Sequence, residues 1–220
     1  MIRTGSILMT KNKDWTGNKH IYICNHRKKD SEVEEHEFYS THPDSVFAFL
    51  DKCKQRNIVL PNKIWENCAG IGHISKTLES EGYEVLSTDL VDRGFGIGNV
   101  DVLKLERDTL PKEWLPYTDC IFTNPPYKIG QSFIEKSLEL ASPTAYVIMF
   151  LKLTFLESKA RIELFNKHKL QYVFVHANRQ GCGKNGGDEN GNFVNGGASC
   201  YAWYIWKNDY NGLPELDWIE

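Results

Sequence analysis

The stretch of the sequence best suited to chemistry is Thr123-Asn124-Pro125-Pro126-Tyr127, which directly follows the apolar residues 120–122. The two prolines lack backbone N–H donors and hold φ at about −65°, so a hydrogen-bonded strand cannot continue through them. We therefore expect the Asn124 side chain and the proline carbonyl groups to project as acceptors from the end of a buried strand. A planar group with an exocyclic amino group would satisfy these acceptors and pack its face on the Tyr127 ring. This favours a nucleobase-binding site, although a proline turn that merely ends a strand is the alternative.

A glycine-containing turn lies upstream of this stretch. Residues 63–75 predict a short strand, a turn of small residues and the start of an amphipathic helix, which Gly82 ends. Gly70 and Gly72 permit positive φ, so a ligand could approach the backbone closely at a helix N-terminus, and Glu66 opens the turn. A plain strand-to-helix turn would explain a single Gly-x-Gly equally well.

An acidic residue ends the next predicted strand, residues 84–88. Asp89 follows the glycine turn by about twenty residues, where doubly wound folds place the carboxylate that accepts both hydroxyls of a ribose. We expect it at an exposed strand end. Asp92 competes for the role but lies further beyond the strand.

Taken in order, these motifs resemble those of amino-group methyltransferases that use S-adenosylmethionine, and specifically of DNA adenine-N6 methyltransferases. The resemblance covers about residues 38 to 206 and implies that the catalytic residues are Asn124, Pro125, Pro126 and Tyr127. It implies S-adenosyl-L-methionine as the cofactor, bound by Glu66, Gly70, Gly72, Asp89, Asp101 and Val102. The family also has an aromatic element before a helix that lines the methionine part, which matches Tyr39 and Thr41. Here His42 stands between Thr41 and Pro43, which departs from the family's Thr-Pro.

The resemblance implies direct methyl transfer to the N6 amino group of an adenine flipped out of DNA, with RNA as a possible substrate. An RNA base or a protein glutamine is the alternative methyl acceptor, because both present a similar planar group. Glutamine enzymes usually carry an N-terminal helical domain, which the irregular residues 1–37 do not suggest. A non-catalytic, methyltransferase-like subunit that binds nucleic acid is a further alternative; a degenerate Asn-Pro-Pro-Tyr motif would favour it, and this motif is intact.

The order of apolar segments predicts an α/β architecture. Apolar residues at helical spacing predict a helix from Pro43 to about Gln55. Later segments predict helices over residues 133–141 and 156–165, and the second of these has Glu157 and Arg161 at i,i+4. Apolar runs predict buried strands at residues 145–150, 172–175 and 201–206. This alternation predicts a Rossmann-like methyltransferase fold, a mostly parallel seven-stranded sheet with helices on both faces. No helix separates the last two strands, so we expect an antiparallel edge strand, and the tail after residue 207 is expected to be surface packing.

The length and composition fit a single domain. The chain has 220 residues, 41% apolar and 25% charged, and its net charge of −3 gives no overall attraction to nucleic acid. Binding would rest on local basic clusters at residues 11–13, 26–29 and 161–169, which a solvated surface explains equally well. We expect residues 1–37 to be an extension of uncertain structure and residues 38–220 to be one methyltransferase domain. Its glycine-rich loop at about 179–199 is expected either to be disordered or to order on substrate, with Arg179 and Lys184 near phosphates.

The cysteines and the hydropathy indicate the cellular setting. Six cysteines lack paired spacing, no signal peptide is evident, and no apolar run reaches the length of a membrane span. These features favour a cytoplasmic protein with free thiols and no membrane association. Cys24, His26 and His36 could bind zinc, but a fourth ligand is not evident, so we expect no metal.

Overall fold

The computed structural model describes residues 39–178, the backbone of residues 182–184, and residues 199–220. All of them belong to one compact unit that spans residues 34–220. The predictions for residues 1–37, including the zinc ligands Cys24, His26 and His36, lie outside the described residues. So does most of the predicted glycine-rich loop.

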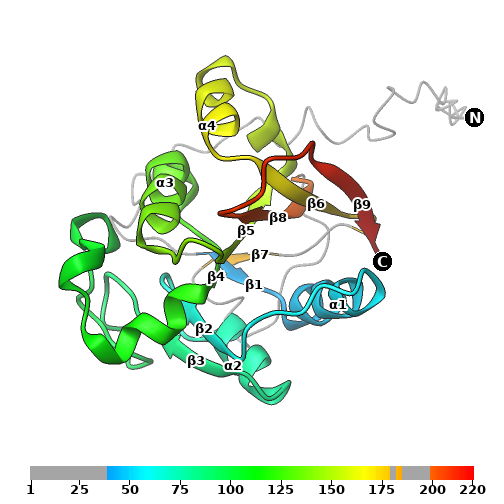
Figure 1. Ribbon diagram of the computed structural model, residues 1–220. Helices are drawn as coiled ribbons and strands as arrows, with labels where there is room; N and C mark the ends of the chain where they lie inside the picture. The colour runs from blue at the N-terminus through cyan, green and yellow to red at the C-terminus, as the bar shows by residue number, and fades with distance from the viewer. Residues whose placement is uncertain (1–38, 179–181, 185–198) are drawn as a thin grey trace, which may run out of the picture. The chain divides into compact units, whose positions relative to one another are not determined.

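The unit is built on a seven-stranded sheet with the order β3-β2-β4-β5-β8-β6-β9 (Figure 1). The neighbouring pairs are parallel, except that β8 runs antiparallel to both β5 and β6. The strands are β2 (Lys63–Glu66), β3 (Glu84–Ser87), β4 (Cys120–Thr123), β5 (Tyr146–Lys152), β6 (Leu170–His176), β8 (Tyr201–Lys207) and β9 (Glu215–Ile219). The predicted fold class, a mostly parallel, Rossmann-like α/β sheet, is confirmed.

The position of the antiparallel strand differs from the prediction. β6 and β8 do pair antiparallel, but β8 lies inside the sheet between β5 and β6. The six residues Tyr201 to Trp206 are all buried, so this strand needs neighbours on both sides and cover on both faces. The edge is taken by β9, which the sequence analysis wrongly treated as surface packing. Leu216 and Trp218 of β9 are more than half exposed, at 51% and 57%, as an edge strand allows.

Two helices cover each face of the sheet. α1 (Pro43–Gln55) and α2 (His73–Ser80) lie on one face, and α3 (Gly130–Leu140) and α4 (Ile162–Lys167) lie on the other (Figure 1). α1 begins and ends where the sequence predicts, because Pro43 fits the first turn and His42 caps it. The His42 Nδ1 accepts a hydrogen bond from the Asp44 N–H at 3.1 Å.

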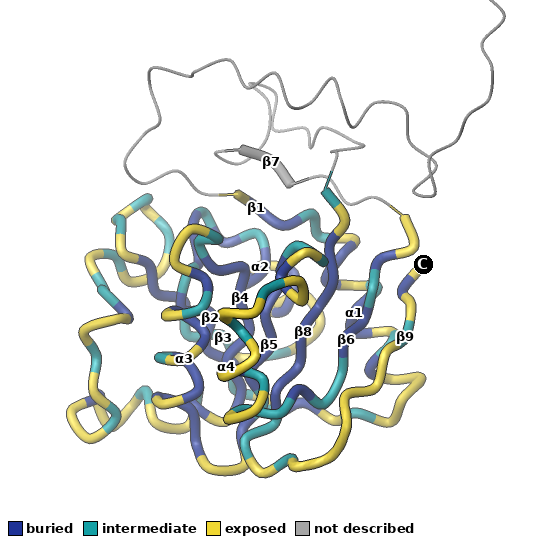
Figure 2. Tube along the Cα trace, turned by 90° about the horizontal axis from the view of Figure 1, so that it is seen from above, coloured by how far each residue is buried: buried dark blue, intermediate teal, exposed yellow. Residues whose placement is uncertain are grey.

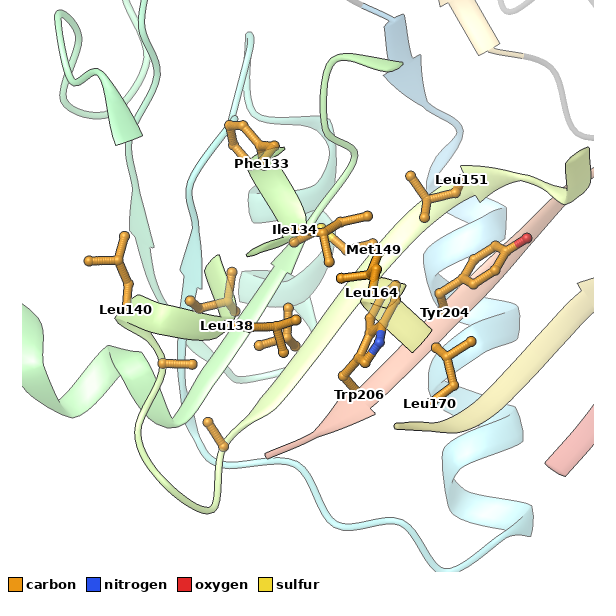
Figure 3. Close-up of a cluster of buried hydrophobic side chains, with 14 of the residues drawn as sticks. Phe133, Ile134, Leu138, Leu140, Met149, Leu151, Leu164, Leu170, Tyr204 and Trp206 are labelled. Carbon is orange, nitrogen blue, oxygen red and sulfur yellow. The ribbon is translucent and has the colours of Figure 1, made fainter. Parts of the chain in front are cut away.

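The two faces of the sheet form two hydrophobic layers. Under α1 and α2 the layer is largely aromatic, with Phe49 packed against Phe122 and Trp203 at ring-centroid distances of 5.1 and 5.2 Å. On the other face, side chains of α3 and α4 meet the strands (Figure 3); those labelled include Phe133, Ile134, Leu138, Leu164, Met149, Leu151, Tyr204 and Trp206. The central strands β4, β5 and β8 are accordingly buried along nearly their whole length (Figure 2). Each large apolar side chain buried this way contributes about 1.5–3 kcal/mol.

The single helix predicted over residues 156–165 is wrong. Two 3₁₀ turns, Leu153–Leu156 and Lys159–Arg161, precede α4. The Arg161 guanidinium donates to the carbonyl oxygens of Phe155 at 2.8 Å and Thr154 at 3.4 Å, so it holds the turn after β5 and does not form a helical pair with Glu157. Other 3₁₀ turns are Val102–Lys104, Arg107–Thr109, Lys112–Asp119 and Tyr127–Ile129.

A small second sheet joins two segments that are distant in the sequence. β1 (Tyr39–Thr41), directly before α1, pairs antiparallel with β7 (Cys182–Lys184), and Tyr39 lies opposite Lys184 (Figure 1). β7 belongs to the predicted glycine-rich loop. Part of that loop is therefore held by β1.

Candidate active site

The predicted site residues lie mainly at one edge of the sheet. β2, β3, β4 and β5 are parallel neighbours, so their carboxyl ends share an edge. Glu66 ends β2, Asp89 follows β3, and Asn124 follows β4. The structure thus brings together the two groups of residues that the sequence analysis assigned to cofactor and to methyl acceptor.

The glycine turn after β2 has the backbone that its residues suggest. Gly70 and Gly72 adopt φ of 58° and 83°, and Gly72 is the N-cap of α2. A Cβ at Gly72 would lie 2.3 Å from the ring of Phe95. We predicted from the sequence that a ligand could approach the backbone closely at this turn. At Gly72, the side chain of Phe95 makes that close approach instead.

Glu66 is buried beneath this turn. Its carboxyl group accepts the backbone N–H of Ser75 at 2.8 Å and also a short hydrogen bond from the Ser75 hydroxyl. Burial raises the pKa of Glu66 to about 8, although the two bonds from Ser75 oppose the shift. Glu66 therefore ties the end of β2 to the first turn of α2, and Ser75 is a structural partner that the sequence analysis missed. Its contact with a cofactor stays a prediction.

Asp89 is also buried, at 5% exposure, which corrects the expectation of an exposed strand end. One carboxylate oxygen accepts the Gly70 N–H at 2.7 Å and the other accepts the Val91 N–H at 2.9 Å. Asp89 thereby joins the end of β3 to the glycine turn. The competing Asp92 accepts the N–H of Gly94 in its own exposed turn.

The loop after β3 returns to the same edge. The Val100 N–H donates to the Asp89 carbonyl at 2.9 Å, which brings the next residue, Asp101, to the end of β3. Asp101 caps the 3₁₀ turn Val102–Lys104 by accepting the Leu103 N–H, and it pairs with Lys104 at 2.9 Å. Val102 is buried. Asp101 therefore begins a 3₁₀ turn, and the cofactor contact that the resemblance implies for it stays a prediction.

Asn124 follows β4 and is held by β1. Its Nδ2 donates to the Tyr39 carbonyl at 2.7 Å, which fixes the orientation of the amide. The other end, Oδ1, is buried and has no hydrogen-bond partner among the described residues. The hydroxyl oxygens of Thr123 and Thr41 are likewise buried without a partner in the described part of the chain. These are acceptors that a donor-bearing ligand could satisfy.

Aromatic rings and one lysine surround Tyr127. Its ring lies 6.1 Å from that of Tyr39 with an interplanar angle of 18°, and 6.2 Å from that of Tyr201. The Lys152 Nζ lies 5.4 Å from the centre of the Tyr127 ring. Tyr39 is thus placed beside the Asn-Pro-Pro-Tyr motif, whereas the sequence analysis predicts it to bind the cofactor. Tyr201 and Lys152 were missed, although Lys152 ends the apolar strand next to the motif, a position that the strand register could have revealed.

Other chemical features are few in the described part of the chain. There, no helix is long and apolar enough to cross a membrane, and no three His, Cys, Asp or Glu side chains are arranged to hold a metal. Cys53, Cys68, Cys120 and Cys200 are free thiols, and burial raises the pKa of Cys53 to about 12. A buried thiol of this kind is a poor nucleophile.

Comparison with known proteins supports the fold only. No family model and no curated protein matches this chain. The structure is similar to a "putative hemolysin" from Lactococcus lactis, with a TM-score of 0.55, 8% identity, and coverage of 79% of this chain and 91% of that one. It is also similar to a "putative hemolysin" from Streptococcus thermophilus, with a TM-score of 0.51, 11% identity and coverage of 84% and 71%.

A third similar structure is a "putative RNA methyltransferase" from Pyrococcus horikoshii, with a TM-score of 0.49, 14% identity and coverage of 77% of this chain and 84% of that one. At this score the likeness supports no conclusion about this chain. The first two similarities, at identities of 8% and 11%, show a shared architecture and leave the function to the site itself.

Proposed function

We propose that this chain is an S-adenosylmethionine-dependent methyltransferase that acts on the exocyclic N6 amino group of adenine in DNA. The proposal rests on the hydrogen bonding of the Asn124 side-chain amide. Its donor end is bound to the Tyr39 carbonyl, and its acceptor end is buried without a partner among the described residues. The buried Oδ1 of this amide is available to accept a further hydrogen bond, which suits an amino group.

The residues of the cofactor half fit the proposed cofactor. The turn at Gly70 and Gly72 lies beside Asp89, as a nucleoside attached to a short polar chain requires. Each oxygen of the Asp89 carboxylate accepts one backbone N–H and retains a second lone pair for a ribose hydroxyl. Asp101 and Val102, next to the end of β3, would face the adenine of the cofactor.

The roles of the chain's own residues follow from these positions. Asn124 Oδ1 and the Pro125 carbonyl accept the two N6 protons and draw the nitrogen lone pair out of conjugation with the ring. When bound, S-adenosylmethionine supplies the methyl group, whose bond to sulfur breaks as the nitrogen attacks. The methylated nitrogen is acidic and releases its proton afterwards. No nucleophilic thiol is needed for this transfer.

An adenine in duplex DNA must leave the base stack to reach Asn124. Flipping costs a few kcal/mol. Stacking on the Tyr127 ring offsets about 1–3 kcal/mol of that cost. The position of Tyr127 beside Asn124 therefore supports a planar substrate, and the same geometry would accept an RNA base or the amide of a glutamine side chain.

The test is incubation of the full chain with methyl-labelled cofactor and separate DNA, RNA and protein substrates, followed by analysis of the labelled nucleosides and amino acids. We expect label in N6-methyladenine of DNA, and strongly reduced label with the Asn124→Ala variant. Label only in RNA or in N5-methylglutamine would replace the proposed substrate. Cofactor binding without transfer to any substrate would indicate the non-catalytic alternative.

A further inference from the structure

Lys152 is a cation beside the candidate methyl-acceptor site to which the proposed function gives no role. Lys152 is the last residue of β5. Because Met149 of β5 pairs with Thr123, the last residue of β4, Lys152 lies beyond the end of β4, at the same carboxyl edge of the sheet as Asn124. Its Nζ lies 5.4 Å from the centre of the Tyr127 ring. In the described part of the chain, Lys152 forms no ion pair.

Three other lysines in the described part of the chain lie over aromatic rings, and they show what is unusual about Lys152. Lys207 lies 5.8 Å from the Tyr146 ring and also pairs with Asp209 at 3.1 Å. Lys63 lies over Tyr117 and pairs with Glu84, and Lys76 lies over Phe95 and donates to the Ile71 carbonyl. Each of these ammonium groups has an oxygen partner. Among the described residues, Lys152 has only the ring.

The ring that Lys152 contacts is the one on which the substrate base would stack. Stacked aromatic rings have centroids about 4.5–7 Å apart, and the Lys152 ammonium group, the Tyr39 ring and the Tyr201 ring all lie within that distance of the Tyr127 ring. A base therefore stacks on the ring only if one of these neighbours moves. Lys152 is the easiest to move, because its side chain is long and flexible. By contrast, the Tyr39 backbone is bonded to Asn124 and paired with β7, and Tyr201 is buried in β8.

A displaced ammonium group needs a new negative partner. A nucleotide brings one, since its phosphate accompanies the base, whereas the side chain of a protein glutamine brings none. We propose that Lys152 is a substrate-positioning residue that leaves the Tyr127 ring to bind the phosphate of the incoming nucleotide. This inference rests on the proposed function and narrows its substrate class to a polyanionic nucleic acid.

The test compares the salt dependence of DNA binding for four full-length proteins: wild type, Lys152→Met, Lys152→Arg and Lys207→Met. Lys207→Met is the matched control: Lys207 is on the neighbouring strand β8 and lies over the ring of Tyr146, at the end of β5 opposite to Lys152. A fluorescein-labelled DNA duplex is titrated by anisotropy at several salt concentrations. One lost phosphate contact reduces the slope of log affinity against log salt by about 0.9. We expect this reduction in Lys152→Met alone, with about 5–10-fold weaker binding at 0.1 M salt.

An unchanged slope in Lys152→Met, or an equal reduction in Lys207→Met, would overturn the inference. Lys152→Gln repeats the test if the methionine variant fails to fold, as judged by thermal unfolding. Methyl transfer by the wild type is measured in parallel, so the two proposals can fail separately. If methyl transfer to DNA occurs but the salt-dependence slope does not depend on Lys152, the proposed function is supported and the inference about Lys152 is overturned. If the slope depends on Lys152 but no methyl transfer occurs, the phosphate contact of Lys152 is supported and the proposed function is overturned.

Discussion

The two halves of the sheet's carboxyl edge satisfy their polar groups in different ways. In the cofactor half, at the ends of β2 and β3, the carboxyl groups of Glu66, Asp89 and Asp101 all accept backbone N–H groups of nearby turns. In the substrate half, after β4, the acceptor atoms of Asn124 and Thr123 are buried and have no partner among the described residues. Asn67 is an exception in the cofactor half, because its Oδ1 is also buried without a described partner.

This difference indicates that the cofactor half is held together by its own hydrogen bonds, whereas the substrate half keeps acceptors for a ligand. A buried acceptor without a donor costs about 1–3 kcal/mol, and a ligand that supplies the donor recovers that energy. The cofactor half is assembled by its own hydrogen bonds before any ligand arrives. A ligand with N–H groups would stabilise the substrate half. Variants in the two halves should therefore affect different measurements.

The largest effect is expected from the pH dependence of stability in the cofactor half. Burial raises the pKa of Glu66 from 4.5 to about 8, so between these pH values the folded protein binds more protons than the unfolded chain. The wild type should then lose stability as pH rises from 4.5 to 8, by on the order of 4 kcal/mol. Glu66→Gln keeps an acceptor for Ser75 and cannot ionise. Urea unfolding at pH 5 and pH 8 should show a smaller loss in the variant.

If the stabilities of the wild type and Glu66→Gln instead change in parallel with pH, the carboxyl group is ionised in the folded protein. The cofactor half would then contain an unneutralised buried charge. It could no longer be described as satisfied before ligand binding.

In the substrate half, Asn124→Ala should reduce turnover strongly and leave cofactor affinity unchanged. The amide oxygen contacts the amino group as its charge develops, and loss of one such contact typically costs about 10²–10³-fold in rate. Rates and cofactor affinities are measured separately, by single-turnover transfer and by titration. Asn124→Asp is the comparison variant, because it keeps an acceptor but replaces the donor to the Tyr39 carbonyl with an acceptor and adds a negative charge. A proportional loss of cofactor affinity in Asn124→Ala would place Asn124 in the cofactor half.

The sequence predicted the parts of the site that depend on local chain chemistry. Pro43 and the helical spacing after it located α1, and the two prolines after Thr123 located the end of β4. The edge strand β9 was missed because Glu215–Ile219 has only one residue in the core, Ile219. Its pairing with β6 depends on a neighbour about forty residues earlier in the sequence, which no local pattern reports.

The contacts made by the site residues were harder to predict. Each of the main contacts joins residues from different elements: the Phe95 ring packs on Gly72, Ser75 donates to Glu66, and the Tyr39 carbonyl accepts from Asn124. Motif order indicates which residues share an edge of the sheet. It does not indicate whether a carboxylate there is bound by the protein or left for a ligand, which is the difference between the two halves.

Asp89→Ala should affect both cofactor binding and stability. Loss of the proposed ribose contacts should weaken cofactor binding by roughly 2–3 kcal/mol. The N–H groups of Gly70 and Val91 would also lose their acceptor, so the free energy of unfolding should fall by about 1–2 kcal/mol. Cofactor titration and urea unfolding measure the two effects. The exposed Asp92→Ala is the matched control; a larger loss of cofactor affinity there would transfer the ribose role to Asp92.

The smallest effect is expected at Tyr127, where the substrate half uses an aromatic face. Tyr127→Ala should weaken capture of the flipped base by about 1–3 kcal/mol, the value of one stacking contact. Tyr127→Phe keeps the ring, including the surface near Tyr39 and Lys152, and should remain largely active. A fluorescent base analogue at the target position reports base capture directly. Cofactor affinity should not change in either variant, since the cofactor half is assembled without Tyr127. If Tyr127→Phe is as inactive as Tyr127→Ala, the hydroxyl group is required and stacking is not the function of this residue.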